Sequence, residues 1–409
     1  MTRRTERPLP LAVWLLGLVV IGVLVLVAFR QWPWSVFDRD QQRNLVVGIA
    51  HLDLRYAFDD WFQTSGPGFG LYAQPVYLAA HPFVTQLQAY QLAGASTVVP
   101  LGAAAIAALR AVGVARRSAR ELFLTAMVVL SVPTLACFSE AWHPSDVLAT
   151  ALCLAAFATR TRGHRTATAL ILGAALATRQ WALIPLAITV VLDDEEHRLR
   201  VLLTACATAA VLVLPFFVAG PKHVLEALGA DDVARTDVGA VGLLPLGPAL
   251  RLIVSRYIPL ALTAAVCAWC YRRRLRWDPE LALGAMAVTL LARAAIDPAL
   301  AAYYLAPGAA CFTIMWRRSW AAPTAAYVAG WLFWWRLDVL QDHPGTAELT
   351  ADPGTWFHVG RLLTLASTAV LVGFIVAAWL RTRARGTELA GTDTSGSSTP
   401  PLPEPVAPA

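Results

Sequence analysis

The chain has 409 residues, of which 57% are apolar and only 15% are charged. Soluble domains contain about 45–50% apolar and about 25% charged residues, so this composition excludes an ordinary soluble protein. Apolar runs of roughly 17–25 residues recur along the whole chain, and each is long enough to cross a bilayer. The sequence therefore predicts an all-α, polytopic integral membrane protein with about 10 full transmembrane helices and one hairpin of short helices.

The net charge of +6 is carried by arginines that cluster in short turns between apolar runs. Arginine-rich short turns are typical of the cytoplasmic side of a membrane protein, so the charge indicates topology and not a nucleic-acid partner. The clusters are Arg116-Arg117-Arg120, Arg160-Arg162-Arg165, Arg272-Arg273-Arg274-Arg276, Arg317-Arg318 and Arg381-Arg383-Arg385.

Six cysteines lie within the apolar runs. Cys267 and Cys270 have the spacing of redox or zinc sites, but one predicted helix contains both and no second ligand pair lies nearby. We interpret this pair as small hydrophobic side chains of the core, and no disulfide framework is expected. Asp59 and Asp60 are adjacent carboxylates that would accept a divalent metal, but no third ligand is indicated. We therefore expect no cofactor and no metal site.

The N-terminal third predicts one transmembrane helix followed by a long loop. Residues 1–9 are basic and expected in the cytoplasm, and the apolar run at about 10–29 is too long for a signal peptide, which favours an uncleaved helix. Residues 31–87 then form the first extracytoplasmic loop, in which 53–62 has the apolar spacing of an interfacial helix. Helices follow at about 88–110, 121–138 and 144–158.

Residues 166–192 are apolar, but both of their flanks have cytoplasmic character, so a single full crossing does not fit. We predict a hairpin of two short helices with Arg179 at its tip, buried in protein because lipid does not tolerate irregular backbone. Further helices are expected at about 199–219, 256–271, 279–296, 301–316, 319–337 and 359–380. These helices complete a transmembrane domain over 10–380, and the Gly/Thr/Ser/Pro-rich tail at 381–409 is predicted to be cytoplasmic and disordered.

With this topology, most other ionisable residues fall on the extracytoplasmic side or at its membrane boundary. Charged groups inside a membrane domain are costly and mark functional sites. Arg179 and Arg293 bear most of that cost, and a pair of arginines suits a phosphate, which guanidinium binds in a bidentate manner. The set on this side comprises Asp53, Asp59, Asp60, His81, Glu140, His143, Asp146, Arg179, Arg293 and Asp297.

A carboxylate-rich loop above buried cations suits a reaction on a lipid phosphate. A sugar on a polyprenyl phosphate already has a good leaving group, so no acid is needed to protonate a departing oxygen. One carboxylate that takes the proton of the acceptor hydroxyl is then sufficient. Glycosidases differ, because they need two carboxyl groups at a defined separation.

Four motifs share this side of the membrane and follow one another along most of 10–380. They are Asp53-Leu-Arg-Tyr56 with Asp59-Asp60, Trp142-His143-Pro144-Ser-Asp146, Leu176-Ala-Thr-Arg179-Gln180-Trp181-Ala, and Asp297-Pro298 with Tyr303-Tyr304-Leu-Ala-Pro307. In these motifs the chain resembles the C-type (GT-C) superfamily of polytopic glycosyltransferases, specifically the actinobacterial polyprenol-phosphate-mannose-dependent mannosyltransferases. The resemblance implies a lipid-linked sugar donor, an active site on the outer face and an aspartate base in the first outer loop.

The choice of that base stays open within the loop. In such enzymes the base stands close to the end of the first helix, where this chain has Asp38 and Asp40, whereas Asp53 better matches the acidic-x-x-Tyr context. We rank Asp53 first, followed by Asp60, Asp59 and Asp40. Each of these carboxylates also has a plain interpretation as a solvated loop residue or a helix cap.

Other motif residues have plain interpretations too. Tyr303 and Tyr304 are typical of an interfacial aromatic belt. His143 is explained equally as a helix-cap neighbour satisfied by Asp146. The acidic run at 193–196 is interpreted as a solvated cytoplasmic loop.

We therefore predict a glycosyltransferase of the cell membrane that transfers a hexose, specifically mannose, from a polyprenyl-phosphate donor to an extracytoplasmic lipid or glycan acceptor. Both termini are expected in the cytoplasm, among membrane lipids and with no nucleic-acid partner. The rival interpretation is a lipid or solute transporter, which predicts ionisable residues at the bilayer midplane and paired halves. The candidate bases are Asp53, Asp60 and Asp59, and the candidate substrate-binding residues are Arg179, His143, Asp146, Tyr56, Arg293, Asp297 and Tyr304.

Overall fold

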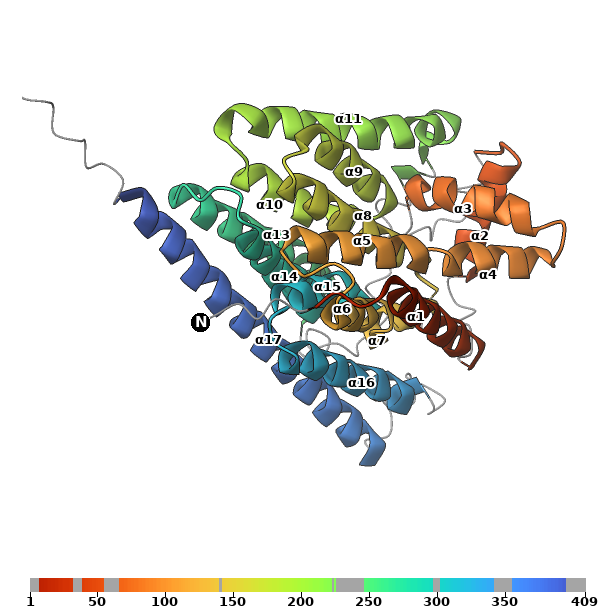
Figure 1. The fold of residues 1–409 in the computed structure, drawn as a ribbon. Helices are drawn as coiled ribbons and strands as arrows, with labels where there is room; N and C mark the ends of the chain where they lie inside the picture. The colour runs from red at the N-terminus through yellow and green to blue at the C-terminus, as the bar shows by residue number, and fades with distance from the viewer. Residues whose placement is uncertain are drawn as a thin grey trace, which may run out of the picture.

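The fold is a bundle of helices of very different lengths, seen in a computed structural model (Figure 1). The structure describes residues 7–31, 39–54, 66–139, 142–222, 224–225, 246–296, 302–341 and 355–394. Every regular element in this described part is a helix, which confirms the predicted all-α class. Tyr56, Asp59, Asp60, Glu140 and Asp297 lie outside the described residues.

The first half of the chain forms α1 (Leu11–Gln31), α2 (Arg39–Ala50), α3 (Pro67–Ala80), α4 (Gln86–Ala95), α5 (Val98–Ala111), α6 (Ala119–Val129), α7 (Val132–Ser139), α8 (Pro144–Thr161), α9 (Arg165–Thr178), the short 3₁₀ helix η2 (Gln180–Ala182) and α10 (Leu183–Leu192). The second half forms α11 (Glu195–Ala219), α13 (Pro248–Arg272), α14 (Pro279–Ile296), the 3₁₀ helix η4 (Ala302–Leu305), α15 (Ala306–Met315), α16 (Ala321–Gln341) and α17 (Thr355–Thr394).

Fewer full crossings are found than the predicted number of about 10. In the described chain, six spans are long and apolar enough to cross a membrane, and a seventh results if α6 and α7, bent by 42°, count as one. The interior helices account for the difference. α8 carries the buried Asp146 and Arg160, and α9 and α10 have only 14 and 10 residues. A helix enclosed by other helices need not be apolar all round.

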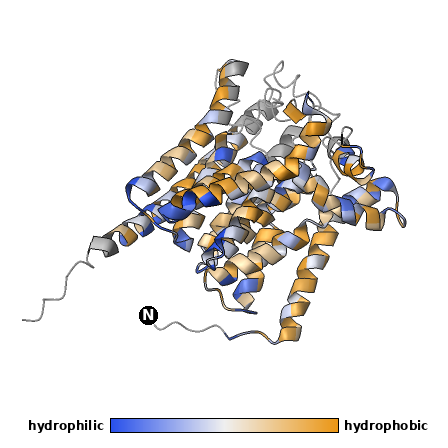
Figure 2. Ribbon diagram, turned by 90° about the horizontal axis from the view of Figure 1, so that it is seen from above, coloured by the Kyte–Doolittle hydropathy of each residue, from blue (hydrophilic) through white to orange (hydrophobic). Residues whose placement is uncertain are grey.

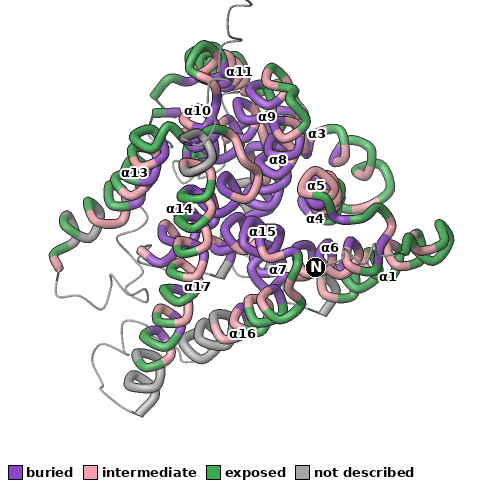
Figure 3. The backbone as a smooth tube through the Cα atoms, turned by 60° about the vertical axis from the view of Figure 1, so that its left-hand side comes forward, coloured by how far each residue is buried: buried purple, intermediate pink, exposed green. Residues whose placement is uncertain are grey.

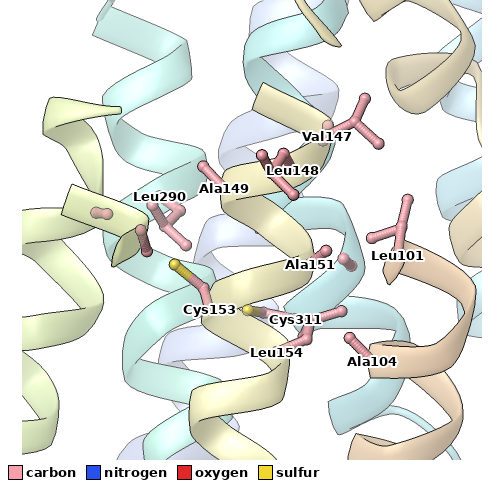
Figure 4. Close-up of a cluster of buried hydrophobic side chains, with 14 of the residues drawn as sticks. Leu101, Ala104, Val147, Leu148, Ala149, Ala151, Cys153, Leu154, Leu290 and Cys311 are labelled. Carbon is pink, nitrogen blue, oxygen red and sulfur yellow. The ribbon is translucent and has the colours of Figure 1, made fainter. Parts of the chain in front are cut away.

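The central helix α8 packs against α5, α9 and α15 (Figure 3). Its alanines allow close helix packing, which is the main source of attraction between helices in lipid. Figure 4 shows Val147, Leu148 and Leu154 of α8 beside Leu101 of α5 and Leu290 of α14. All five side chains are less than 5% exposed.

The peripheral helix α1 is almost wholly apolar on its surface, as the orange helix that follows the N-terminus in Figure 2. Val25 is its one buried residue in the described chain, so its apolar surface suits contact with lipid. Trp14 anchors it by donating a hydrogen bond from Nε1 to the buried Glu121 of α6 over 2.9 Å. The predicted first transmembrane helix at 10–29 is therefore found in nearly the same place.

The arginine-rich turns meet at one end of the bundle, where ion pairs and hydrogen bonds to carbonyls join them. Arg160 and Arg165 both donate to Asp193 Oδ1, over 2.7 and 3.0 Å. Asp193 is 1% exposed, so its interpretation as a solvated loop residue is wrong. Arg317 donates to Glu280 over 2.6 Å and to the carbonyl of Val112 over 2.9 Å, which extends the network across the bundle.

The last helix is longer than predicted. α17 continues through Arg381, Arg383 and Arg385 to Thr394, whereas the sequence predicts its end near 380 and a disordered tail from 381. Arg385 explains the extension, because its Nη2 donates to Asp278 Oδ2 over 2.8 Å. The next residue, Gly386, packs against the ring of Trp269, so an apolar contact stands beside the ion pair.

Candidate active site

The hairpin predicted at 166–192 is present, and Arg179 lies at its tip. α9 ends at Thr178, Arg179 is extended with φ −149° and ψ 130°, and η2 follows at Gln180. Pro185 lacks an amide hydrogen, so an unbroken helix through this segment would lose a hydrogen bond. The break turns Arg179 into the protein, where it is 6% exposed.

Arg179 forms a buried, bidentate ion pair with Asp146 of the first turn of α8. Its Nε donates to Asp146 Oδ1 over 2.8 Å, and its Nη2 donates to Asp146 Oδ2. Trp181 adds a third donor, from Nε1 to Asp146 Oδ1 over 2.6 Å. A bidentate arginine–carboxylate pair with further hydrogen bonds is the geometry in which buried charges compensate each other.

His143 is held against the same pair. Its Nδ1 lies 3.2 Å from Arg179 Nη2 and 3.6 Å from Asp146 Oδ2. Its ring stacks on Tyr303, with 4.4 Å between centroids and 20° between planes. Because a guanidinium only donates, Nδ1 is the acceptor in the contact with Arg179. The imidazole is 3% exposed and has a fixed orientation.

Two tyrosines connect this cluster to the second arginine. Tyr303 and Tyr304 have centroids 4.3 Å apart, and the guanidinium carbon of Arg293 lies 5.1 Å above the ring of Tyr304. Within the described chain, no carboxylate pairs with Arg293, which is half-buried. We name the connected residues Asp146, Arg179, Trp181, His143, Tyr303, Tyr304 and Arg293 the arginine cluster. It unites five of the predicted substrate-binding residues.

The first loop docks on the hairpin tip through two glycines. Gly66 donates its amide to the carbonyl of Thr178 over 3.0 Å, directly beside Arg179. A Cβ at Gly66 would lie 2.0 Å from the Ala177 carbonyl oxygen, and one at Gly68 would lie 2.4 Å from Thr178 Oγ1. Only glycine allows this approach. At Gly66, where the described chain resumes, the backbone therefore lies next to the arginine cluster.

Asp53 is exposed and follows α2, where its amide donates to the Gly48 carbonyl over 2.8 Å. α2 packs on α3 at Gly70, since a Cβ there would lie 2.4 Å from Ile49 Cδ1. Gly70 is one turn, about 6 Å along the axis, from Gly66. In the described contacts, Asp53 is thus linked to the cluster through α3 and does not touch it.

Two members of the cluster received no functional role from the sequence. Trp181 stands two residues after Arg179 in a quoted motif, but its indole hydrogen bond to Asp146 has no signature in the chain. Tyr303 is buried against His143, so its assignment to an interfacial belt is wrong. The sequence signal was a Tyr-Tyr pair directly before a helix, and such a pair fits an interfacial belt and a buried functional site equally well.

Trp142 fixes the start of α8 on the other side. It is fully buried, and its Nε1 donates to Tyr90 Oη over 2.7 Å. Gly94 of α4 leaves room for the indole, because a Cβ there would lie 2.7 Å from it.

In the described residues, no three His, Cys, Asp or Glu side chains come together in a way that would hold a metal ion.

No family model matches the sequence, and no curated protein matches it. Among solved structures, the chain is similar to ArnT from Cupriavidus metallidurans bound to undecaprenyl phosphate, with 16% identity, a TM-score of 0.49, and coverage of 93% of this chain and 74% of that one. Apo ArnT from the same organism gives 16% identity, a TM-score of 0.49, and coverage of 91% and 73%. The third is an Archaeoglobus fulgidus oligosaccharyltransferase tethered to an acceptor peptide containing the NVT sequon. It has 12% identity and a TM-score of 0.39, and the match covers 90% of this chain and 55% of that one. At these identities and TM-scores the similarities do not establish a family.

Proposed function

We propose that this protein is a membrane glycosyltransferase that moves a sugar from a polyprenyl phosphate to an acceptor hydroxyl. The observation that carries the proposal is the arginine cluster, in which three motifs far apart in the chain form one buried polar unit beside the first loop. Buried charges in a membrane bundle are expensive and are retained for function. The resemblance of the same motifs to GT-C enzymes gives the reaction class.

Arg293 is the better candidate for the donor phosphate. Arg179 already pairs with Asp146, whereas no carboxylate pairs with Arg293 in the described chain. A guanidinium without a carboxylate partner binds a phosphate without first breaking an internal ion pair. In this assignment Arg179 and Asp146 position His143, and Tyr304 holds the Arg293 guanidinium in place.

The chemistry then needs one carboxylate from the first loop. The acceptor oxygen attacks the anomeric carbon, the bond from that carbon to the phosphate oxygen breaks, and the carboxylate takes the acceptor proton. The polyprenyl phosphate leaves with the electron pair, stabilised by the arginine. Asp53 remains our first candidate for the base, with Asp60 and Asp59 next. We propose mannose as the sugar on the resemblance alone.

The arginine-rich turns support the orientation that we propose. They gather at the end of the bundle opposite to the hairpin tip, since Arg165 begins α9 and Arg179 follows its last residue. By the positive-inside rule, this arrangement favours both termini in the cytoplasm and the arginine cluster toward the outer face.

The test is transfer of radiolabelled mannose from polyprenyl-phosphate-mannose in membranes that contain the full-length protein. We expect transfer by the wild type, and its loss in Asp53→Asn and in Arg293→Gln at equal amounts of folded protein. Asp194→Asn, a half-exposed carboxylate at the other end of the bundle, serves as the control and should retain transfer. Transfer by Asp53→Asn at the wild-type rate would move the base to Asp60 or Asp59. Lipid movement across the membrane without transfer would support a transporter instead.

A further inference from the structure

A cavity of about 460 Å³ lies between α9 and α11, at the arginine-rich end of the bundle. The close packing of the two helices determines its shape. A Cβ at Gly173 would lie 2.4 Å from the Ala205 carbonyl oxygen and 2.5 Å from Thr208 Cβ, so the helices touch there. Ala169 and Thr204, one turn before that contact, line the cavity, which extends from there to the turn at Gly163.

Two arginines and two histidines line this cavity. His164, Arg165, His197 and Arg200 line it, and no carboxylate is among its described lining residues. Arg165 is compensated by Asp193 and Asp194, and His197 Nδ1 lies 3.2 Å from the exposed Glu196.

Two of the four groups have no such compensation. In the described chain, neither Arg200 nor His164 makes an ion pair or a side-chain hydrogen bond, and both are exposed. Thr166 and Thr204 add hydroxyl groups to the lining. α9 begins here with no side-chain cap, so the positive end of its dipole adds to the electrostatic potential of the cavity. The cavity therefore offers an anion one full positive charge and several donors.

The surroundings of the cavity are apolar and suit acyl chains. Leu170 of α9 is 47% exposed, and Leu203 of α11 is 57% exposed, both within one or two turns of the cationic lining. α11 is itself long and apolar enough to span a membrane. A headgroup in the cavity would thus be followed along α9 and α11 by the side chains that acyl tails prefer.

We propose that this cavity binds the phosphate headgroup of an anionic phospholipid of the bilayer. Arg200 and His164 contact the phosphate, and the acyl chains lie along the outward leucines of α9 and α11. Basic pockets between helices at the arginine-rich side of a membrane protein have the chemistry for such headgroups. The site is independent of the proposed sugar transfer, because the arginine cluster lies at the other end of α9.

The test measures lipid retention by native mass spectrometry on full-length protein released from mixed micelles of phosphatidylglycerol and phosphatidylcholine with identical chains. We expect the wild type to retain phosphatidylglycerol in preference, and Arg200→Gln to lower that preference roughly fivefold, the effect of one arginine near a membrane surface. Arg272→Gln removes an exposed arginine of α13 outside the cavity and should leave the preference unchanged.

Three outcomes would overturn the proposal. The first is equal retention of both lipids by the wild type, and the second is an equal loss of preference in Arg200→Gln and Arg272→Gln. The third is displacement of the lipid by glycerol 3-phosphate at the same concentration, which would assign the cavity to a soluble phosphate. Arg200 is exposed and unpaired in the described chain, so its variant is expected to fold, and thermal unfolding checks that.

Discussion

Arg179 and Asp146 are 33 residues apart in the chain and form a buried ion pair with two parallel hydrogen bonds. The pair joins the tip of the α9–α10 hairpin to the first turn of the central helix α8. Removing one partner from a buried pair leaves an uncompensated charge, which costs about 3–5 kcal/mol. The pair therefore links the two helical segments and also fixes the position of His143, which contacts both partners.

We expect Asp146→Asn to destabilise the protein by about 3–5 kcal/mol, because the Arg179 charge stays buried without a counter-ion. Thermal unfolding in detergent measures the effect. The double variant Asp146→Asn with Arg179→Gln should recover part of the loss, since it removes the stranded charge. Asp194→Asn, a half-exposed carboxylate, is the matched control. Unchanged unfolding of Asp146→Asn would show that the pair contributes nothing.

Gly66→Ala should undock the first loop from the hairpin tip. The new methyl group would lie 2.0 Å from the Ala177 carbonyl oxygen. Either α3 moves away from the hairpin tip, or the backbone at Gly66 is strained. Overpacking of this kind costs about 1–3 kcal/mol. Faster hydrogen exchange in α3 and lower transfer activity are the expected results.

Gly247→Ala is a close control for that variant. Gly247 also precedes a proline at the start of a helix and has a similar backbone conformation, with φ −65° against −75° at Gly66. Among the described residues, no atom lies within 4 Å of a Cβ built there. Equal effects of the two substitutions would refute the packing explanation.

Arg293→Gln should weaken donor binding, because the proposed phosphate ligand loses its charge. Hydrogen bonds to charged groups contribute about 1.5–3 kcal/mol, so kcat/KM for the lipid donor should fall about 10- to 100-fold. Arg293→Lys keeps the charge but not the bidentate geometry, and its loss should be smaller. A fall in kcat/KM for the acceptor with unchanged donor kinetics would place the phosphate elsewhere.

Acid should detach the C-terminal end of α17. Burial alone would raise the pKa of Asp278, but hydrogen bonds from Arg385 and the Leu281 amide outweigh burial and hold that pKa below its ordinary value. A depressed pKa gives stability that is complete above the ordinary value of about 3.9 and is lost as pH falls through the lower folded-state pKa.

A spin label at Ala390→Cys reports this detachment by its mobility. We expect the mobility to rise below about pH 4 in the wild type, and to be already high and independent of pH in Asp278→Asn. Glu388→Gln also removes a partner of Arg385 but leaves the Asp278 contact, so it should behave as the wild type does. An identical acid profile in Asp278→Asn would exclude Asp278 as the titrating group.

The predictable parts of the fold are those set by apolar length. α1 and α8 lie close to their predicted ranges, and the hairpin tip falls at Arg179 as expected, because a short apolar run between two charged flanks favours a hairpin over a single crossing. The ends of helices were less predictable where polar contacts decide them. α17 extends past Arg381 and Arg383 because Arg385 forms an ion pair with Asp278, which lies more than 100 residues earlier in the chain.

The candidate site was predictable as a set of residues and not as a set of contacts. The topology assigned His143, Asp146, Arg179 and Arg293 to one side of the membrane. It did not show that Asp146 pairs with the guanidinium of Arg179, or that Tyr304 is the contact of Arg293 in the described part of the chain. Local spacing cannot give a pairing across separate helices, and the burial of Asp193 was missed for the same reason.

The Asp146–Arg179 pair also bears on how the chain enters the membrane during synthesis. Asp146 leaves the ribosome before Arg179 has been made, so its charge has to enter the membrane domain before its partner exists, and an unpaired charge there is costly. α1 has no charged residue in its apolar stretch and can enter lipid without a partner helix. The charge of Asp146 is compensated only once α9 and Arg179 have been made, so we expect α8, α9 and α10 to settle in the bilayer together.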